Sequence, residues 1–100
     1  MNRVTSLLLL LLFSFGSGAD PFLVEGKKKA RLCTSCHGPL GISRVPSYPN
    51  LAGQKAEYLA KQLRDYKTGK RQDPQMSRLA RSLSEQEINE LSLWFASLKR

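Results

Sequence analysis

The residues best suited to chemistry are two cysteines and a histidine that lie within five consecutive positions, Cys33-Thr34-Ser35-Cys36-His37. The chain contains no other cysteine and no other histidine. Their C-x-x-C-H spacing is that of covalent haem attachment. With two residues between the thiols, one helical turn presents both sulfurs to the vinyl groups on one porphyrin edge, and the next residue places an imidazole beneath the iron. The motif therefore predicts one covalently bound haem c, with Cys33 and Cys36 as thioether anchors and His37 as an iron ligand.

Three other interpretations of this motif are open. A thioredoxin-like redox pair also uses C-x-x-C, but it follows a strand, and no such pattern precedes Cys33. A structural zinc site needs four ligands, and here only a carboxylate could complete the set. A plain disulfide between Cys33 and Cys36 would leave the position of His37 unexplained. We favour haem attachment because it accounts for all three residues.

A second axial iron ligand is needed if the haem transfers electrons, and Met76 is the candidate. The other methionine, Met1, lies in a segment that we expect to be removed. A thioether is a soft, neutral ligand that favours ferrous iron and raises the reduction potential. Methionine is more often a core side chain. Met76, however, follows Asp73-Pro74-Gln75, where we predict a loop, and we therefore predict that it ligates the iron.

The first nineteen residues have the pattern of a signal peptide. Arg3 precedes an apolar run over residues 7–13, and the small residues Ser17 and Ala19 are spaced for cleavage. The stretch from Leu7 to Phe15 offers about half the roughly 20 apolar residues that a membrane-spanning helix needs. We expect cleavage after Ala19, which would leave one domain over residues 20–100 in the periplasm. Export is compatible with haem attachment, because c-type maturation takes place outside the cytoplasm.

The formal net charge of +8 predicts acidic partners. Export excludes nucleic acid, the usual partner of a basic protein. Anionic protein surfaces remain, as does a loose association with a membrane surface. Among the basic residues near the motif in sequence, we expect Lys27, Lys28, Lys29 and Arg44 to steer docking. The alternative is that these charges only keep a small domain soluble.

Helical periodicity dominates the chain after the leader, and no segment alternates as a strand would. Breakers between Gly38 and Pro49, and again at Gly69 and Pro74, predict two loops. A capping box, formed by Ser84 and the glutamate three residues later, marks the start of the last helix. We therefore predict an all-α fold with helices over residues 23–36, 54–67 and 85–98.

The chain resembles a class I cytochrome c, and in particular the small bacterial carriers of the cytochrome c4 and cytochrome c553 group. The resemblance covers nearly all of the chain after the leader. It is carried by Gly26, Cys33-Thr34-Ser35-Cys36-His37-Gly38, Leu51-Ala52-Gly53-Gln54, Asp73-Pro74-Gln75-Met76 and Trp94-Phe95-Ala96. It implies three to four helices around one haem. Cytochromes c4 carry two haem domains in tandem, whereas this chain has one motif and so resembles the monohaem carriers.

The resemblance also implies contacts within the fold. The first and last helices should cross near Gly26, with Leu91 and Trp94 packed at the crossing. A carbonyl of the loop after the motif should accept a hydrogen bond from His37, and that of Pro46 is preferred to that of Pro49. Such a bond would fix the orientation of the ring.

Tyr48 is a further candidate in this loop, where it would pack on the haem or reach a propionate. Ordinary loop packing is the alternative for Tyr48.

The predicted function is transfer of single electrons between donor and acceptor proteins, with no catalytic activity of its own. Both axial ligands would stay bound and no substrate would coordinate. One alternative is a haem subunit that receives electrons from a catalytic partner in a larger oxidoreductase, which should expose a larger apolar patch. Another is a haem enzyme or gas sensor, which requires an open position on the iron.

Overall fold

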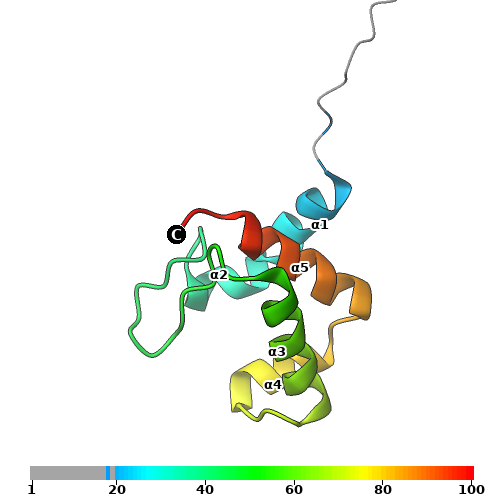
Figure 1. Cartoon of the computed structure of the whole chain (residues 1–100). Coiled ribbons are helices and arrows are strands. Elements are labelled where there is room, and N and C mark those ends of the chain that lie inside the picture. Colours follow the sequence, from blue (N-terminus) through cyan, green and yellow to red (C-terminus); the bar gives the residue numbers. More distant parts are fainter. Residues whose placement is uncertain (1–17, 19) are drawn as a thin grey trace, which may run out of the picture.

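Five α-helices make up the part of the chain that the computed structural model describes, residue 18 and residues 20–100, and this part has no strand. The all-α prediction is confirmed, with five helices where the sequence predicts three and the resemblance implies three to four. None of the helices in these residues is long and apolar enough to cross a membrane. The predicted signal peptide falls largely on residues 1–17 and 19, which are outside the described residues. In chain order the helices are α1 (Pro21–Lys29), α2 (Arg31–His37), α3 (Ala56–Thr68), α4 (Pro74–Arg81) and α5 (Glu85–Ser97) (Figure 1).

The first predicted helix is in fact two, because the chain turns at Ala30. Asp20 caps α1 by accepting a hydrogen bond from the backbone N–H of Phe22 at 2.9 Å, and Pro21 fits the first helical position. Ala30 is 1% exposed and belongs to the core, and its carbonyl accepts from the N–H of Cys33 at 2.8 Å. The turn gives α2 a direction of its own, and α2 carries the cysteine motif.

The predicted helices over residues 54–67 and 85–98 are confirmed as α3 and α5, with ends shifted by one or two residues. Ser84 Oγ accepts from the N–H of Glu87, and the N–H of Ser84 donates to Glu87 Oε1, both at 3.1 Å, so the predicted capping box is present. Glu87 Oε2 also lies 2.9 Å from Lys29 Nζ. The hydrogen bond from Lys29, together with those from Ser84, lowers the pKa of Glu87 below its usual value. One carboxylate thus caps α5 and links it to α1.

The α1–α5 crossing brings two backbones into contact at Gly26. A Cβ at this position would lie 2.2 Å from the carbonyl oxygen of Glu90 and 2.8 Å from Trp94 Cβ. The predicted crossing at Gly26 is therefore confirmed. The buried core beside it contains Leu91 and joins α5 to α3, and its members are Ala30, Leu59, Ala60, Leu83, Ile88, Leu91 and Phe95.

Candidate haem-binding site

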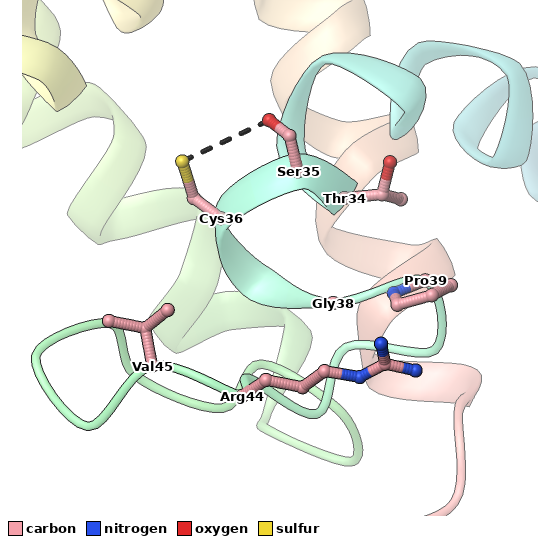
Figure 2. Close-up of a pocket in the computed structure, with 7 residues that line it drawn as sticks. All are labelled: Thr34, Ser35, Cys36, Gly38, Pro39, Arg44 and Val45. Atoms are coloured by element: carbon pink, nitrogen blue, oxygen red, sulfur yellow. Dashed lines mark hydrogen bonds between the residues drawn. The ribbon is translucent and has the colours of Figure 1, made fainter.

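The cysteine motif occupies α2, as the geometric argument required. Cys33 and Cys36 are half-buried free thiols at positions i and i+3 of one helix, which places them on the same face. Figure 2 shows the Cys36 side chain, beside Ser35 Oγ at 3.9 Å, pointing to the opposite side of α2 from Thr34. The two sulfurs are thus available to one flat group lying along the helix.

Gly38 ends α2 immediately after His37. Its φ of +86° is in the left-handed region, and a Cβ there would lie 1.9 Å from the carbonyl oxygen of Ile42. The loop that follows is closed at its base, because the carbonyl of Gly41 accepts from the N–H groups of Leu51 at 2.8 Å and Ala52 at 3.0 Å. This closure returns the chain to His37 just before α3.

His37 is held by the returning segment of this loop. The residue is 7% exposed, and its Nδ1 lies 2.8 Å from the carbonyl oxygen of Pro49. A carbonyl oxygen can only accept, so Nδ1 must carry the proton. The lone pair is then on Nε2, the nitrogen that remains for a metal. The structure therefore presets the histidine tautomer that iron ligation requires.

The preferred acceptor in the sequence analysis, Pro46, is wrong. Pro46 lies at the exposed tip of the loop, where the N–H of Tyr48 bonds to the carbonyl of Val45 at 3.0 Å. Because the loop closes at Gly41, Pro49 and not Pro46 reaches the ring. Tyr48 is half-buried, and its ring centroid lies 6.4 Å from that of His37 at an interplanar angle of 53°. Tyr48 thus lies in the histidine environment.

Met76 lies in the first turn of α4 and not in a loop as predicted. Asp73 caps this helix by accepting from the N–H groups of Gln75 at 3.0 Å and Met76 at 2.8 Å, and Pro74 occupies the first helical position. Met76 is half-buried, whereas Arg78 on the other side of α4 is exposed. Met76 is therefore held in the first turn of a short helix, and Asp73 caps the N-terminus of this helix with two hydrogen bonds.

The surface beside the motif has a small hollow and several exposed apolar side chains. A hollow of about 240 Å³ is lined in part by Cys36, Gly38, Arg44 and Val45, and Figure 2 shows the Arg44 guanidinium pointing toward Pro39. Large apolar side chains near the motif are also exposed: Leu32 (62%), Leu40 (66%), Ile42 and Val45. An apolar surface, two neighbouring free thiols and an unprotonated imidazole nitrogen together match the chemistry of a covalently attached porphyrin.

Comparison with known proteins is consistent with this chemistry. The sequence profile of the family described as Cytochrome c matches residues 23–99 of this chain. The chain belongs to the cytochrome c family. Covalently bound haem c is the cofactor of this family, and the C-x-x-C-H motif of the chain agrees with it. The fold of this cytochrome, which we predicted from resemblance, is thus confirmed as that of a class I cytochrome c.

Its relatives include cytochrome c4 of Pseudomonas aeruginosa, 41% identical over 100 residues that cover 99% of this chain and 50% of the relative. Cytochrome c-554(548) of Halomonas halodenitrificans is 35% identical over 75 residues, which cover 72% of this chain and 90% of the relative. The crystal structure of reduced recombinant cytochrome c4 from Pseudomonas stutzeri matches with a TM-score of 0.74 and 36% identity, covering 81% of this chain and 50% of that chain. This cytochrome spans about half the length of the cytochrome c4 relatives.

The Cys33 thiol does not have the property of a catalytic thioredoxin-like thiol. Burial, followed by the neighbouring Cys36, raises the pKa of the Cys33 thiol to about 11. Catalytic redox thiols instead have lowered pKa values, because the thiolate is the nucleophile. In the described part of the chain, no three His, Cys, Asp or Glu side chains are grouped so that they could hold a zinc ion.

The three lysines predicted to steer docking have partners within this cytochrome. Lys28 pairs with Glu25 at 3.3 Å and Lys29 with Glu87, while Lys27 lies over the Trp94 ring, 5.9 Å from its centroid. Of the four predicted steering residues, only Arg44 lines the hollow beside Cys36.

Proposed function

We propose that residues 20–100 form a periplasmic, monohaem c-type cytochrome that carries single electrons between redox proteins and has no catalytic activity. Residues 1–19 would be the export signal and would be cleaved. The observation that carries the proposal is the 2.8 Å contact between His37 Nδ1 and the Pro49 carbonyl, which leaves Nε2 free to bind iron beside two free thiols. The single motif in the chain supports one haem.

Each site residue has a separate task in this proposal. Cys33 and Cys36 would hold the haem through thioether bonds, and His37 Nε2 and the Met76 sulfur would be the protein ligands of its iron. The bound haem supplies an iron that accepts and releases one electron. Pro49 fixes the imidazole tautomer and orientation, while the α4 cap fixes the backbone of Met76. Because the protein would supply both iron ligands, no substrate would bind the metal, and the partners would be other proteins.

A redox titration of the purified holoprotein, followed by exposure of the ferrous form to carbon monoxide, tests this function. We expect a reversible one-electron transition and an absorption spectrum that carbon monoxide leaves unchanged, because His37 and Met76 occupy both axial positions. A ferrous form that binds carbon monoxide readily would instead have an open position, as a haem enzyme or gas sensor requires, and would contradict the carrier proposal.

A second candidate is a haem subunit of a larger oxidoreductase. It is favoured by the exposed Leu32 and Leu40 near the motif, since apolar patches mark protein interfaces. Against it, the exposed aromatic side chains Phe22 and Tyr58 belong to different helices, α1 and α3, and are not paired in the described residues. Gel filtration of the native periplasmic extract, followed by haem absorbance, distinguishes a small carrier from a large complex.

A further inference from the structure

Half of the net positive charge of the chain lies in one short segment. The fifteen residues from Lys67 to Arg81 have a net charge of +4, compared with +8 for the whole chain. We call this segment the basic end. Its one carboxylate, that of Asp73, is engaged by the α4 cap. Its five cations are Lys67, Lys70, Arg71, Arg78 and Arg81.

The partners of these cations distinguish them from the four basic residues that form salt bridges. In the described part of the chain, none of them forms a salt bridge with a carboxylate. Lys67 donates to the backbone carbonyl of Leu83. Arg71 lies over the Tyr66 ring at 4.7 Å and donates to Gln62 Oε1 at 2.7 Å. These partners are neutral, whereas salt bridges compensate the charge of Lys28, Lys29, Lys61 and Arg64. The Asp65 carboxylate, just outside the basic end, forms its salt bridge with Lys61, and the charges of Lys70 and Arg71 contribute to lowering its pKa.

The basic end is also concave. A hollow of about 640 Å³ lies between the end of α3 and the start of α4, with Lys67 and Arg81 among its lining residues beside the polar side chains of Gln72 and Ser77. Figure 1 places the α3–α4 connection at the end of the molecule away from α1. Residues in an α-helix are about 100° apart, so Arg78 and Arg81 lie on the other side of α4 from Met76.

An acidic protein segment fits this surface better than a membrane does. Proteins that lie on membranes insert apolar or aromatic side chains beside their basic residues. None of the exposed large apolar side chains lies between Lys67 and Arg81; they are Phe22, Val24, Leu32, Leu40, Ile42, Val45, Tyr58 and Leu93. A flat membrane surface would also leave the hollow empty, whereas protruding carboxylates can enter it.

We propose that the basic end is a docking surface for an acidic segment of a protein partner. That this partner is a redox protein rests on the function proposed above. Exposed charges of this kind mainly raise the association rate and set the orientation of docking, and their effect falls with ionic strength. The surface lies away from the lysines of α1, which are three of the four steering residues that the sequence predicts.

The test is a titration of the isotope-labelled ferrous holoprotein with poly-L-glutamate at low ionic strength, followed by backbone amide chemical shifts. We expect the largest shifts at the amides of residues 67–81. The double variant Arg78→Gln/Arg81→Gln should bind poly-L-glutamate about tenfold more weakly. Arg→Gln keeps a good helix former at both positions, so α4 should remain folded.

The matched control is Lys55→Gln/Lys99→Gln, which removes the same charge from two exposed residues outside the basic end. It should weaken binding less than about twofold, because only the long-range field changes. Equal weakening by both double variants would overturn the proposal, as would shifts centred elsewhere or tighter binding to phosphatidylglycerol vesicles than to poly-L-glutamate. Poly-L-glutamate binding requires no electron transfer, so its outcome is independent of the redox titration that tests the proposed function.

Discussion

Replacing Met76 by alanine is expected to lower the reduction potential by on the order of 0.1 V, within the range of about 0.8 V that axial ligands cover. A neutral thioether ligand stabilises the ferrous state, so its removal should lower the reduction potential. The ferrous variant should also bind carbon monoxide. Alanine is the best helix former, so α4 should persist without the sulfur. Redox titration and absorption spectra of the ferric and ferrous forms measure both effects.

Leu79→Ala is the matched control for this variant. Leu79 is half-buried in the same helix, three residues after Met76, and its truncation removes packing but no candidate ligand. We expect Leu79→Ala to lower the stability while leaving the potential and the spectrum close to those of the parent. If Met76→Ala also left them unchanged, methionine would not be the ligand.

Replacing Gly26 by alanine is expected to destabilise the holoprotein by about 3 kcal/mol, because overpacking of a close backbone contact has to be relieved by movement. The new Cβ would lie 2.2 Å from the Glu90 carbonyl oxygen and 2.8 Å from Trp94 Cβ. For a domain of this size such a loss lowers the melting temperature by roughly 12–24 °C. The effect opposes intrinsic propensity, since alanine favours a helix over glycine by about 1 kcal/mol.

Gly69→Ala is the control variant, because it introduces backbone strain without a close contact. Gly69 has a φ of +83°, but a Cβ at this position would have no neighbouring atom within 4 Å, so only left-handed strain of about 1–2 kcal/mol should appear. Denaturant unfolding of both variants, followed by circular dichroism, provides the comparison. A Gly26→Ala variant no less stable than Gly69→Ala would show that α1 and α5 do not meet at this glycine.

The part of the site that lies within consecutive residues could be predicted from the sequence. Five consecutive residues contain the thiols and the imidazole, and their helical conformation places them without help from distant segments. The hydrogen-bond acceptor of His37 depends instead on how the loop closes at Gly41. The sequence around Pro46 and Pro49 does not indicate which of their carbonyls reaches the ring. The acceptor therefore had to come from the structure.

The helix boundaries that sequence analysis missed have two physical causes. At Asp73-Pro74 we interpreted proline as a breaker, although an aspartate followed by proline is also a helix start. The same pair, Asp20-Pro21, starts α1 two residues earlier than expected. The turn at Ala30 has no such signal, because alanine favours helices and its burial in the core depends on tertiary packing.

Intact mass spectrometry of the exported chain under denaturing conditions tests the central claim most directly. Expressed in a host that matures c-type cytochromes, the chain should have the mass of the polypeptide plus one haem, retained after unfolding because thioether bonds at Cys33 and Cys36 survive it. An exported chain with the mass of the polypeptide alone, its thiols free or joined to each other, would contradict this account.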